Sequence, residues 1–149
     1  MKNKKDVRLY NVLFPFWMIM LIPTTWFIVI PGNFLIDSLV LLIAMKLMHV
    51  ESKKQFYWKH IWKIFVFGII SDLIGSALLF FSVVLEFATM GDELYITIPA
   101  MIISSICIYL FNRYITFKKD EPHIRCKMAL TFAIVTAPYT FLIPSSWLY

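Results

Sequence analysis

Long apolar runs separated by short polar segments are the dominant pattern along this chain. The runs cover residues of about 10–30, 34–50, 61–88, 95–115 and 128–149. The hydrocarbon core of a bilayer is about 30 Å thick and is crossed by roughly 20 helical residues, so each run is long enough to span it. The pattern predicts an all-α integral membrane protein, a single transmembrane domain over residues 1–149 built as a bundle of about five transmembrane helices.

Proline and glycine residues divide the runs and predict where the helices end. Pro31-Gly32-Asn33 is predicted to form a turn, with Asn33 as the N-cap of the second helix. Residues 51–60, 90–93 and 117–127 are polar and are predicted to connect the later helices. The last run contains Pro138 and Pro144, so it is either one kinked span or a re-entrant segment. The span is the preferred interpretation.

The basic residues predict an orientation, because the cytoplasmic loops of membrane proteins are enriched in Lys and Arg. With the N-terminus inside and all five segments crossing, the 14 Lys and Arg residues all fall on the cytoplasmic side. The predicted outer turns at 31–33 and 90–94 and the C-terminus contain none. We therefore expect a multi-pass protein of a bacterial plasma membrane, with the N-terminus cytoplasmic and the C-terminus outside.

Composition agrees with this interpretation and excludes several classes of function. Hydrophobic residues make up 60% of the chain, charged residues 15%, and the mean hydropathy is +0.77. Soluble domains are only about 45–50% apolar, so neither a soluble enzyme nor a nucleic-acid partner is expected. The sequence has no catalytic triad order, HExxH motif or phosphate-binding glycine loop, so we expect no enzyme activity, no cofactor and no metal. His49, His60 and His123 are expected to be solvated, and Cys107 and Cys126 to be free thiols.

Ionisable side chains inside apolar runs are candidates for ligand binding, because burying them in a bilayer is unfavourable. Four stand out, namely Asp37, Lys46, Asp72 and Arg113. Lys46 and Asp72 are predicted at similar depths on antiparallel helices, so we expect them to pair. Each residue also has a structural alternative: a charge partner for Asp72 and Lys46, stabilisation of a helix terminus for Asp37, and an interfacial anchor for Arg113.

Small and hydroxyl side chains surround these charges. Gly68, Ser71, Gly75 and Ser76 share one predicted helix face with Asp72, which is typical of closely packed membrane helices. Ser104, Ser105 and Asn112 are predicted to form hydrogen bonds across helices and complete the candidate ligand-binding residues.

Three short segments of the chain resemble a known family. Residues 65–72 (FVFGIISD) and 78–81 (LLFF) are similar to the opening helix of the GtrA-like family. Residues 111–118 (FNRYITFK) are similar to its closing Asn-Arg-x-x-Thr-Phe pattern, so the resemblance covers about residues 65–118. It implies a small four-helix membrane protein that handles polyprenyl-phosphate sugars in cell-envelope glycosylation, with Asn112 and Arg113 near the lipid phosphate. The arrangement departs from that family, because two predicted helices precede the matching pair here and only one follows it.

The leading functional hypothesis is binding or translocation of a polar-headed lipid, with a polyprenyl-phosphate-linked sugar as the ligand that the resemblance implies. Arg113, Lys118 and Lys119 would attract the phosphate, and Asp72 with the serines would contact the headgroup. One alternative is a non-catalytic membrane subunit that docks another membrane protein through the Gly68–Ser76 face. Another is a small ion-coupled transporter that uses Asp72 and Lys46. Membrane lipids, a second copy of the chain in a homodimer, or a larger membrane protein are the expected partners.

Overall fold

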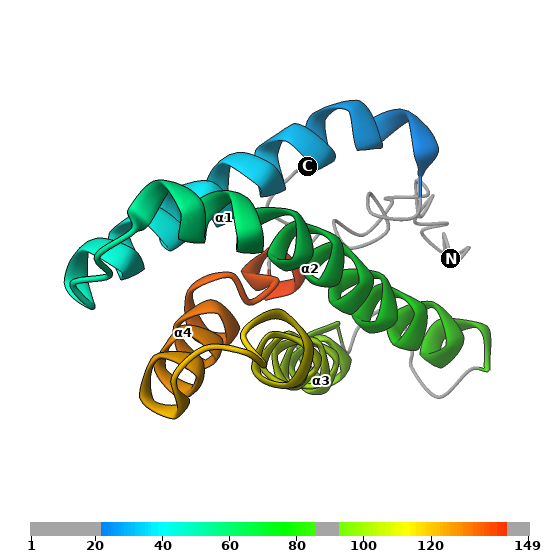
Figure 1. Cartoon of the computed structure of the whole chain (residues 1–149). Helices are drawn as coiled ribbons and strands as arrows, with labels where there is room; N and C mark the ends of the chain where they lie inside the picture. The colour runs from blue at the N-terminus through cyan, green and yellow to red at the C-terminus, as the bar shows by residue number, and fades with distance from the viewer. Residues whose placement is uncertain (1–21, 86–92, 143–149) are drawn as a thin grey trace, which may run out of the picture.

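The computed structural model of the chain describes residues 22–85 and 93–142, and all regular elements in these residues are helical. These residues contain four α-helices, with α1 and α2 side by side and α3 and α4 packed beneath them (Figure 1). Their bounds are Trp26–Leu47 for α1, Lys53–Val84 for α2, Glu93–Phe111 for α3 and Pro122–Val135 for α4. Short 3₁₀ turns lie at Pro23–Thr25 (η2) and Tyr139–Leu142 (η4), and α3 continues into a π-helical turn at Asn112–Thr116 (η3).

The predicted turn at Pro31-Gly32-Asn33 is wrong, because α1 runs through all three residues without a break. Asn33 is therefore not an N-cap, and the end of the first predicted helix and the whole second one form a single helix. Proline removes one backbone hydrogen bond, whereas a turn inside a bilayer leaves several backbone groups without partners. Continuing the helix through Pro31 therefore costs less free energy than forming a turn there. Residues 10–21 of the first predicted helix lie outside the described residues.

The predicted loop at 51–60 is also mostly helical, because α2 begins at Lys53. The turn between α1 and α2 is correspondingly short. His49 adopts the left-handed conformation with φ of 53°, and the Val50 amide donates to the Met45 carbonyl at 3.2 Å. This arrangement is a Schellman motif, which caps the last carbonyls of α1 and reverses the chain within a few residues.

The last predicted helix differs most from the structure. Helix α4 begins at Pro122, inside the segment predicted to be a loop, and its 14 residues end at Val135. A 14-residue helix extends only about 21 Å, which is shorter than the hydrocarbon core. Pro138 disfavours helical conformation in the residue before it, so the chain leaves the helix and turns through η4. The predicted continuous span over 128–149 is therefore not formed in the described residues, and 143–149 lie outside them.

Three helices in the described residues are long and apolar enough to cross a membrane: Pro23–Leu47, Lys53–Ser82 and Tyr95–Thr116. The described residues thus contain three candidate spans and one shorter helix, and the count of five spans stays a prediction. Large apolar side chains on these helices point away from the protein, as with Phe27, which is 86% exposed. Such exposure suits contact with lipid.

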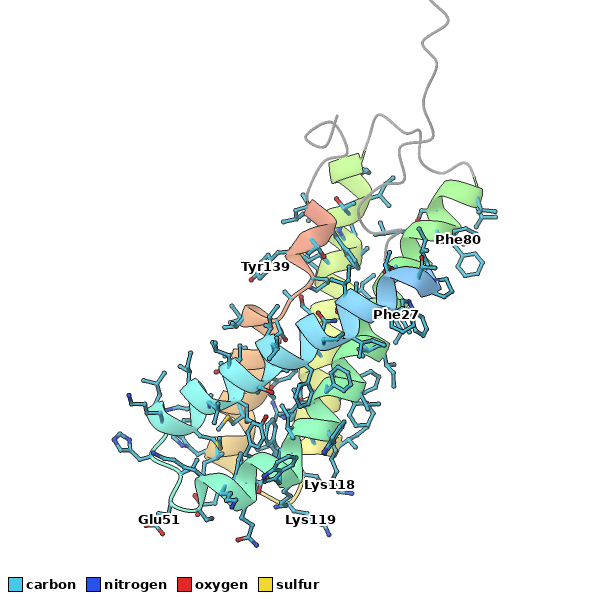
Figure 2. All side chains as sticks on the ribbon, turned by 90° about the horizontal axis from the view of Figure 1, so that it is seen from above. Phe27, Glu51, Phe80, Lys118, Lys119 and Tyr139 are labelled. Atoms are coloured by element: carbon cyan, nitrogen blue, oxygen red, sulfur yellow. The ribbon has the colours of Figure 1, made fainter. Side chains whose placement is uncertain are left out.

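The basic residues gather at one end of the bundle. Figure 2 shows Glu51, Lys118 and Lys119 at this end, whereas Phe27 and Phe80 lie toward the other. The end of α1, the start of α2, η3 and the start of α4 all meet there. We call it the basic end, because it holds every Lys and Arg in the described part of the chain: Lys46, Lys53, Lys54, Lys59, Lys63, Arg113, Lys118, Lys119, Arg125 and Lys127.

Gly75 marks a close approach between elements in the opposite half of the bundle. A Cβ atom built at Gly75 would lie 2.8 Å from Phe141 Cε2, 3.2 Å from Ser104 Cβ and 3.4 Å from the Ala100 carbonyl oxygen. Helix α2 therefore touches both α3 and η4 through the bare backbone of Gly75. The predicted small-residue face thus packs inside the chain at this point.

Replacing Gly75 with alanine is expected to lower the free energy of unfolding by about 1–3 kcal/mol, because the added methyl group overlaps the buried Phe141 ring. Thermal or denaturant unfolding in detergent measures the loss. Gly32→Ala is the matched control, since a Cβ at Gly32 meets nothing within 4 Å. Equal stability of the two variants would contradict the close packing at Gly75.

Candidate functional site

A cavity of about 350 Å³ lies between α1, α2 and the segment that follows α4. Its α1 wall is formed by Val29, Gly32, Asn33, Ile36 and Asp37. Gly68 and Asp72 line it from α2, and residues 135–140 close it from the third side. We call it the carboxyl cavity, because two of the predicted site residues, Asp37 and Asp72, line it together.

Both carboxyl groups of this cavity are almost completely buried. Asp37 is 6% exposed and Asp72 is 8% exposed. The Ser104 hydroxyl on α3 donates a hydrogen bond to Asp72 Oδ1 at 3.2 Å. Asp37 has no hydrogen-bond or ion-pair partner among the residues that the structure describes. The Asp37 carboxyl group lies close to α2, because a Cβ built at Gly68 would be in ordinary van der Waals contact with Asp37 Oδ2 at 3.5 Å.

The predicted pair between Lys46 and Asp72 is wrong. Asp37 faces Asp72 across the cavity, and Lys46 lies about 13 Å farther along α1 with its side chain exposed at the basic end. The difference follows from the helix bounds. Because α2 starts at Lys53, Asp72 lies well above the last turn of α1, which contains Lys46.

The structural alternative for Asp37 is wrong for the same reason. Helix α1 begins at Trp26, so Asp37 is near the middle of the helix and cannot stabilise its N-terminus. Its buried carboxyl group faces the cavity instead.

The remaining small and polar residues of the predicted site separate into different roles. The Ser71 and Ser105 hydroxyls donate to carbonyls one turn back in their own helices, Phe67 and Met101, at 2.8 Å. Among the predicted serines, Ser104 alone is hydrogen-bonded across helices in the described part of the molecule, whereas the buried Ser76 hydroxyl has no partner there. Asn112 is 1% exposed, so it does not share an accessible surface with the adjacent Arg113.

Arg113 lies next to a second hollow, because its side chain contacts Tyr109, one of the residues that line it. This hollow has a volume of about 320 Å³ and we call it the α3–α4 groove. It is lined by Ile102, Ser105, Ile106, Tyr109, Leu130, Ala133 and Ile134. Arg113 Nη1 donates to the Tyr109 hydroxyl, and the guanidinium carbon lies 5.5 Å from the centre of the Tyr109 ring.

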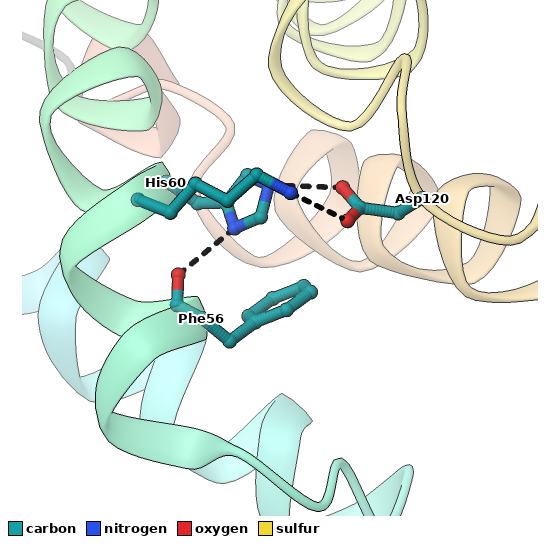
Figure 3. A network of polar contacts seen from close by, with 4 residues as sticks. Phe56, His60 and Asp120 are labelled. Carbon is teal, nitrogen blue, oxygen red and sulfur yellow. Dashed lines mark hydrogen bonds and ion pairs between the residues drawn. The ribbon is translucent and has the colours of Figure 1, made fainter.

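His60 was not recognised as a structural residue from the sequence, and the prediction that it is solvated is wrong. It is 0% exposed, its Nδ1 lies 2.8 Å from the Phe56 carbonyl oxygen, and its Nε2 lies 2.9 Å from Asp120 Oδ2 (Figure 3). Lys59 Nζ contacts the other oxygen of Asp120 at 3.2 Å. These contacts join α2 to the segment between η3 and α4. His49 and His123 are exposed as predicted.

Double-mutant cycles should detect the partner of Asp72 that the geometry shows. We expect Asp72→Ala and Ser104→Ala to couple by about 0.5–3 kcal/mol in unfolding free energy, because each change removes one partner of the same buried hydrogen bond. Asp72→Asn and Lys46→Met should be additive to within about 0.5 kcal/mol. Coupling to Lys46 with additivity at Ser104 would contradict the arrangement of the cavity.

Comparisons with known proteins leave the family of this chain open. No protein-family model, curated protein or solved structure matches it. The residues that resemble the GtrA-like family lie on α2, α3 and η3. Membership of that family therefore stays a prediction.

Proposed function

We propose that this chain is a multi-pass membrane protein that binds a lipid with a phosphate-bearing headgroup in the α3–α4 groove. One observation carries the proposal: an apolar groove on the outside of the bundle is lined by Tyr109, whose hydroxyl accepts a hydrogen bond from the guanidinium of Arg113. A polyprenyl-phosphate-linked sugar and an ordinary anionic phospholipid share this chemistry.

The walls of the groove support an acyl or isoprenoid chain as its contents. Ile102, Ile106, Leu130 and Ile134 are each about half exposed, so the groove is open to the surroundings of the bundle. Helices α3 and α4 are in contact beneath it. An apolar hollow that opens between membrane helices is filled by a lipid chain, because no other apolar molecule is as abundant there.

The headgroup preference follows from the residues at the basic end of the groove. Guanidinium groups form charge-assisted hydrogen bonds with phosphate, and the side chain of Arg113 is only partly buried. Tyr109 holds the guanidinium through a hydrogen bond and a ring contact. Lys118 and Lys119 are exposed and add positive potential at the same end.

Packing within the chain disfavours the alternative of a docking subunit. Its proposed docking face was Gly68 to Ser76, and Gly75 on that face is covered by α3 and Phe141 within the chain. A homodimer or a larger membrane partner would therefore have to use another face.

We further propose that the basic end faces the cytoplasm. Cysteines at Lys54 and Lys119 should be protected from an impermeant thiol reagent in intact cells, whereas a cysteine at Tyr95 should be labelled. These cysteines are introduced into a protein that carries Cys107→Ser and Cys126→Ser, so that the two native thiols do not react. Labelling at position 54 but not at position 95 would show that the basic end faces outward and would contradict the proposed orientation. The predicted positions of both termini, and of residues 90–92 in the outer turn, concern residues outside the described ones.

Lipid retention tests the proposed function directly. Native mass spectrometry of the protein should show retention of dioleoyl phosphatidic acid and undecaprenyl phosphate, but not of dioleoylglycerol, which lacks the phosphate. Arg113→Gln should weaken retention by about tenfold, because it removes a charge-assisted contact worth about 1.5–3 kcal/mol. Lys53→Gln, a change at the same end but on α2, is the control. Equal loss in both variants, or equal retention of the neutral lipid, would contradict a specific phosphate site.

A further inference from the structure

The carboxyl cavity is separate from the α3–α4 groove and has the opposite charge. Asp37 and Asp72 line it, and no Lys or Arg is among the residues around it. All described basic side chains lie at the basic end, and Lys46, the basic residue that follows Asp37 on α1, is about 13 Å away along the helix. The cavity therefore contains acidic groups with no positive counterpart in the described part of the chain.

Helix α4 adds to this negative potential. It ends at Val135, and the residues that follow, Thr136, Ala137 and Pro138, line the cavity. The C-terminus of a helix carries a partial negative charge, and broken membrane helices commonly present such ends to bound cations. The cavity thus combines two carboxyl groups with the negative end of a helix.

Asp37 is the observation that points to a ligand. It is 6% exposed, it faces the cavity, and it has no partner in the described residues. An isolated carboxylate in an apolar environment is strongly unfavourable unless it takes up a proton or another group compensates its charge. Asp72 cannot compensate it, because Asp72 is also acidic and is already held by Ser104.

The size and lining of the cavity favour an organic cation over a bare metal ion. Its volume of about 350 Å³ falls in the range of small-molecule sites, which starts at about 300 Å³. Val29, Ile36 and Val135 provide apolar walls, and Asn33 adds an amide. No group of three or more His, Cys, Asp or Glu residues suited to a metal is found in the described residues.

We propose that the carboxyl cavity binds a small organic molecule that carries a primary ammonium group, held between Asp37 and Asp72. An ammonium group has three N–H donors, which two carboxylates and the Asn33 amide oxygen can accept. The apolar walls contact the carbon skeleton. This site uses different residues from the lipid groove and does not depend on it.

Thermal unfolding of the purified full chain in detergent tests this proposal with benzylamine as the probe. Benzylamine should raise the Tm in a concentration-dependent manner, because a ligand that binds only the folded state stabilises it. Benzyl alcohol, which has the same ring without the charge, and NaCl at equal ionic strength should not. Equal stabilisation by benzyl alcohol, or an effect of NaCl as large as that of benzylamine, would overturn the proposal.

Variants then locate the effect within the cavity. Asp37→Asn and Asp72→Asn should each weaken benzylamine binding by at least about tenfold, since each removes a charge-assisted contact. Glu51→Gln, an exposed acid at the basic end, should bind as well as the unchanged protein. An undiminished response in both aspartate variants would overturn the site.

Gly32→Leu provides a second test that keeps both carboxyl groups. A Cβ at Gly32 meets nothing within 4 Å, so the leucine side chain has room at the cavity wall, and leucine favours helix more than glycine does. This variant should fold and fail to respond to benzylamine. Arg113→Gln should respond normally, which separates failure of this site from failure of the lipid site. A normal response in Gly32→Leu would place the benzylamine outside the cavity and overturn the proposal.

Discussion

The close approach of α2 to α3 and η4 at Gly75 is the contact on which the rest of the structure depends. Because Gly75 has no side chain, Ser104 on α3 comes close enough to α2 to reach Asp72, one turn before Gly75. The same bare backbone receives the ring of Phe141, which is 3% exposed. Phe141 anchors the chain that follows α4, and that chain forms the third wall of the carboxyl cavity. One glycine therefore positions both a partner of Asp72 and the wall opposite it.

A second cluster holds the basic end together. His60 packs against the rings of both Phe56 and Phe117, with centroid distances of 4.2 Å and 5.0 Å, and its Nε2 contacts Asp120. Phe117 and Phe132 are also part of the largest apolar core, to which α1, α2, α3 and α4 all contribute. The segments that bear the Lys and Arg residues at this end therefore pack against a common apolar core. Such packing would suit a phosphate site on Arg113, because a charge-assisted contact is strongest when the donor is already oriented.

Separation of charge along the bundle explains how one small protein can present two different sites. The basic side chains lie at one end, where they can reach water and lipid headgroups. The two aspartates lie deep in the bundle, in the carboxyl cavity between α1, α2 and the chain after α4. An anionic headgroup is repelled from that cavity and attracted to Arg113, whereas a cation has the opposite preference. Charge thus assigns the two proposed ligands to different faces.

Several properties of this protein were determined by the sequence alone. The apolar runs predicted an all-helical chain with membrane-spanning helices, and the positions of Lys and Arg predicted that they share one side. Helix α3 lies almost where its run predicted it, and the spacing of Gly68, Ser71, Gly75 and Ser76 predicted a closely packed face. These properties follow from local composition and helical periodicity, which need no knowledge of neighbouring helices.

Only the tertiary structure decided the continuity of α1, the shortness of α4 and the partners of the buried polar groups. Pro31-Gly32-Asn33 has the local preference of a turn, but a turn there would leave backbone groups unpaired in an apolar environment. Once α1 continues and α2 starts at Lys53, the register between them changes, so that Asp37 replaces Lys46 opposite Asp72. His60 is buried because Asp120, distant in sequence, lies beside it. Pairings of this kind depend on the relative shift of whole helices, and residue spacing within one helix contains no information about that shift.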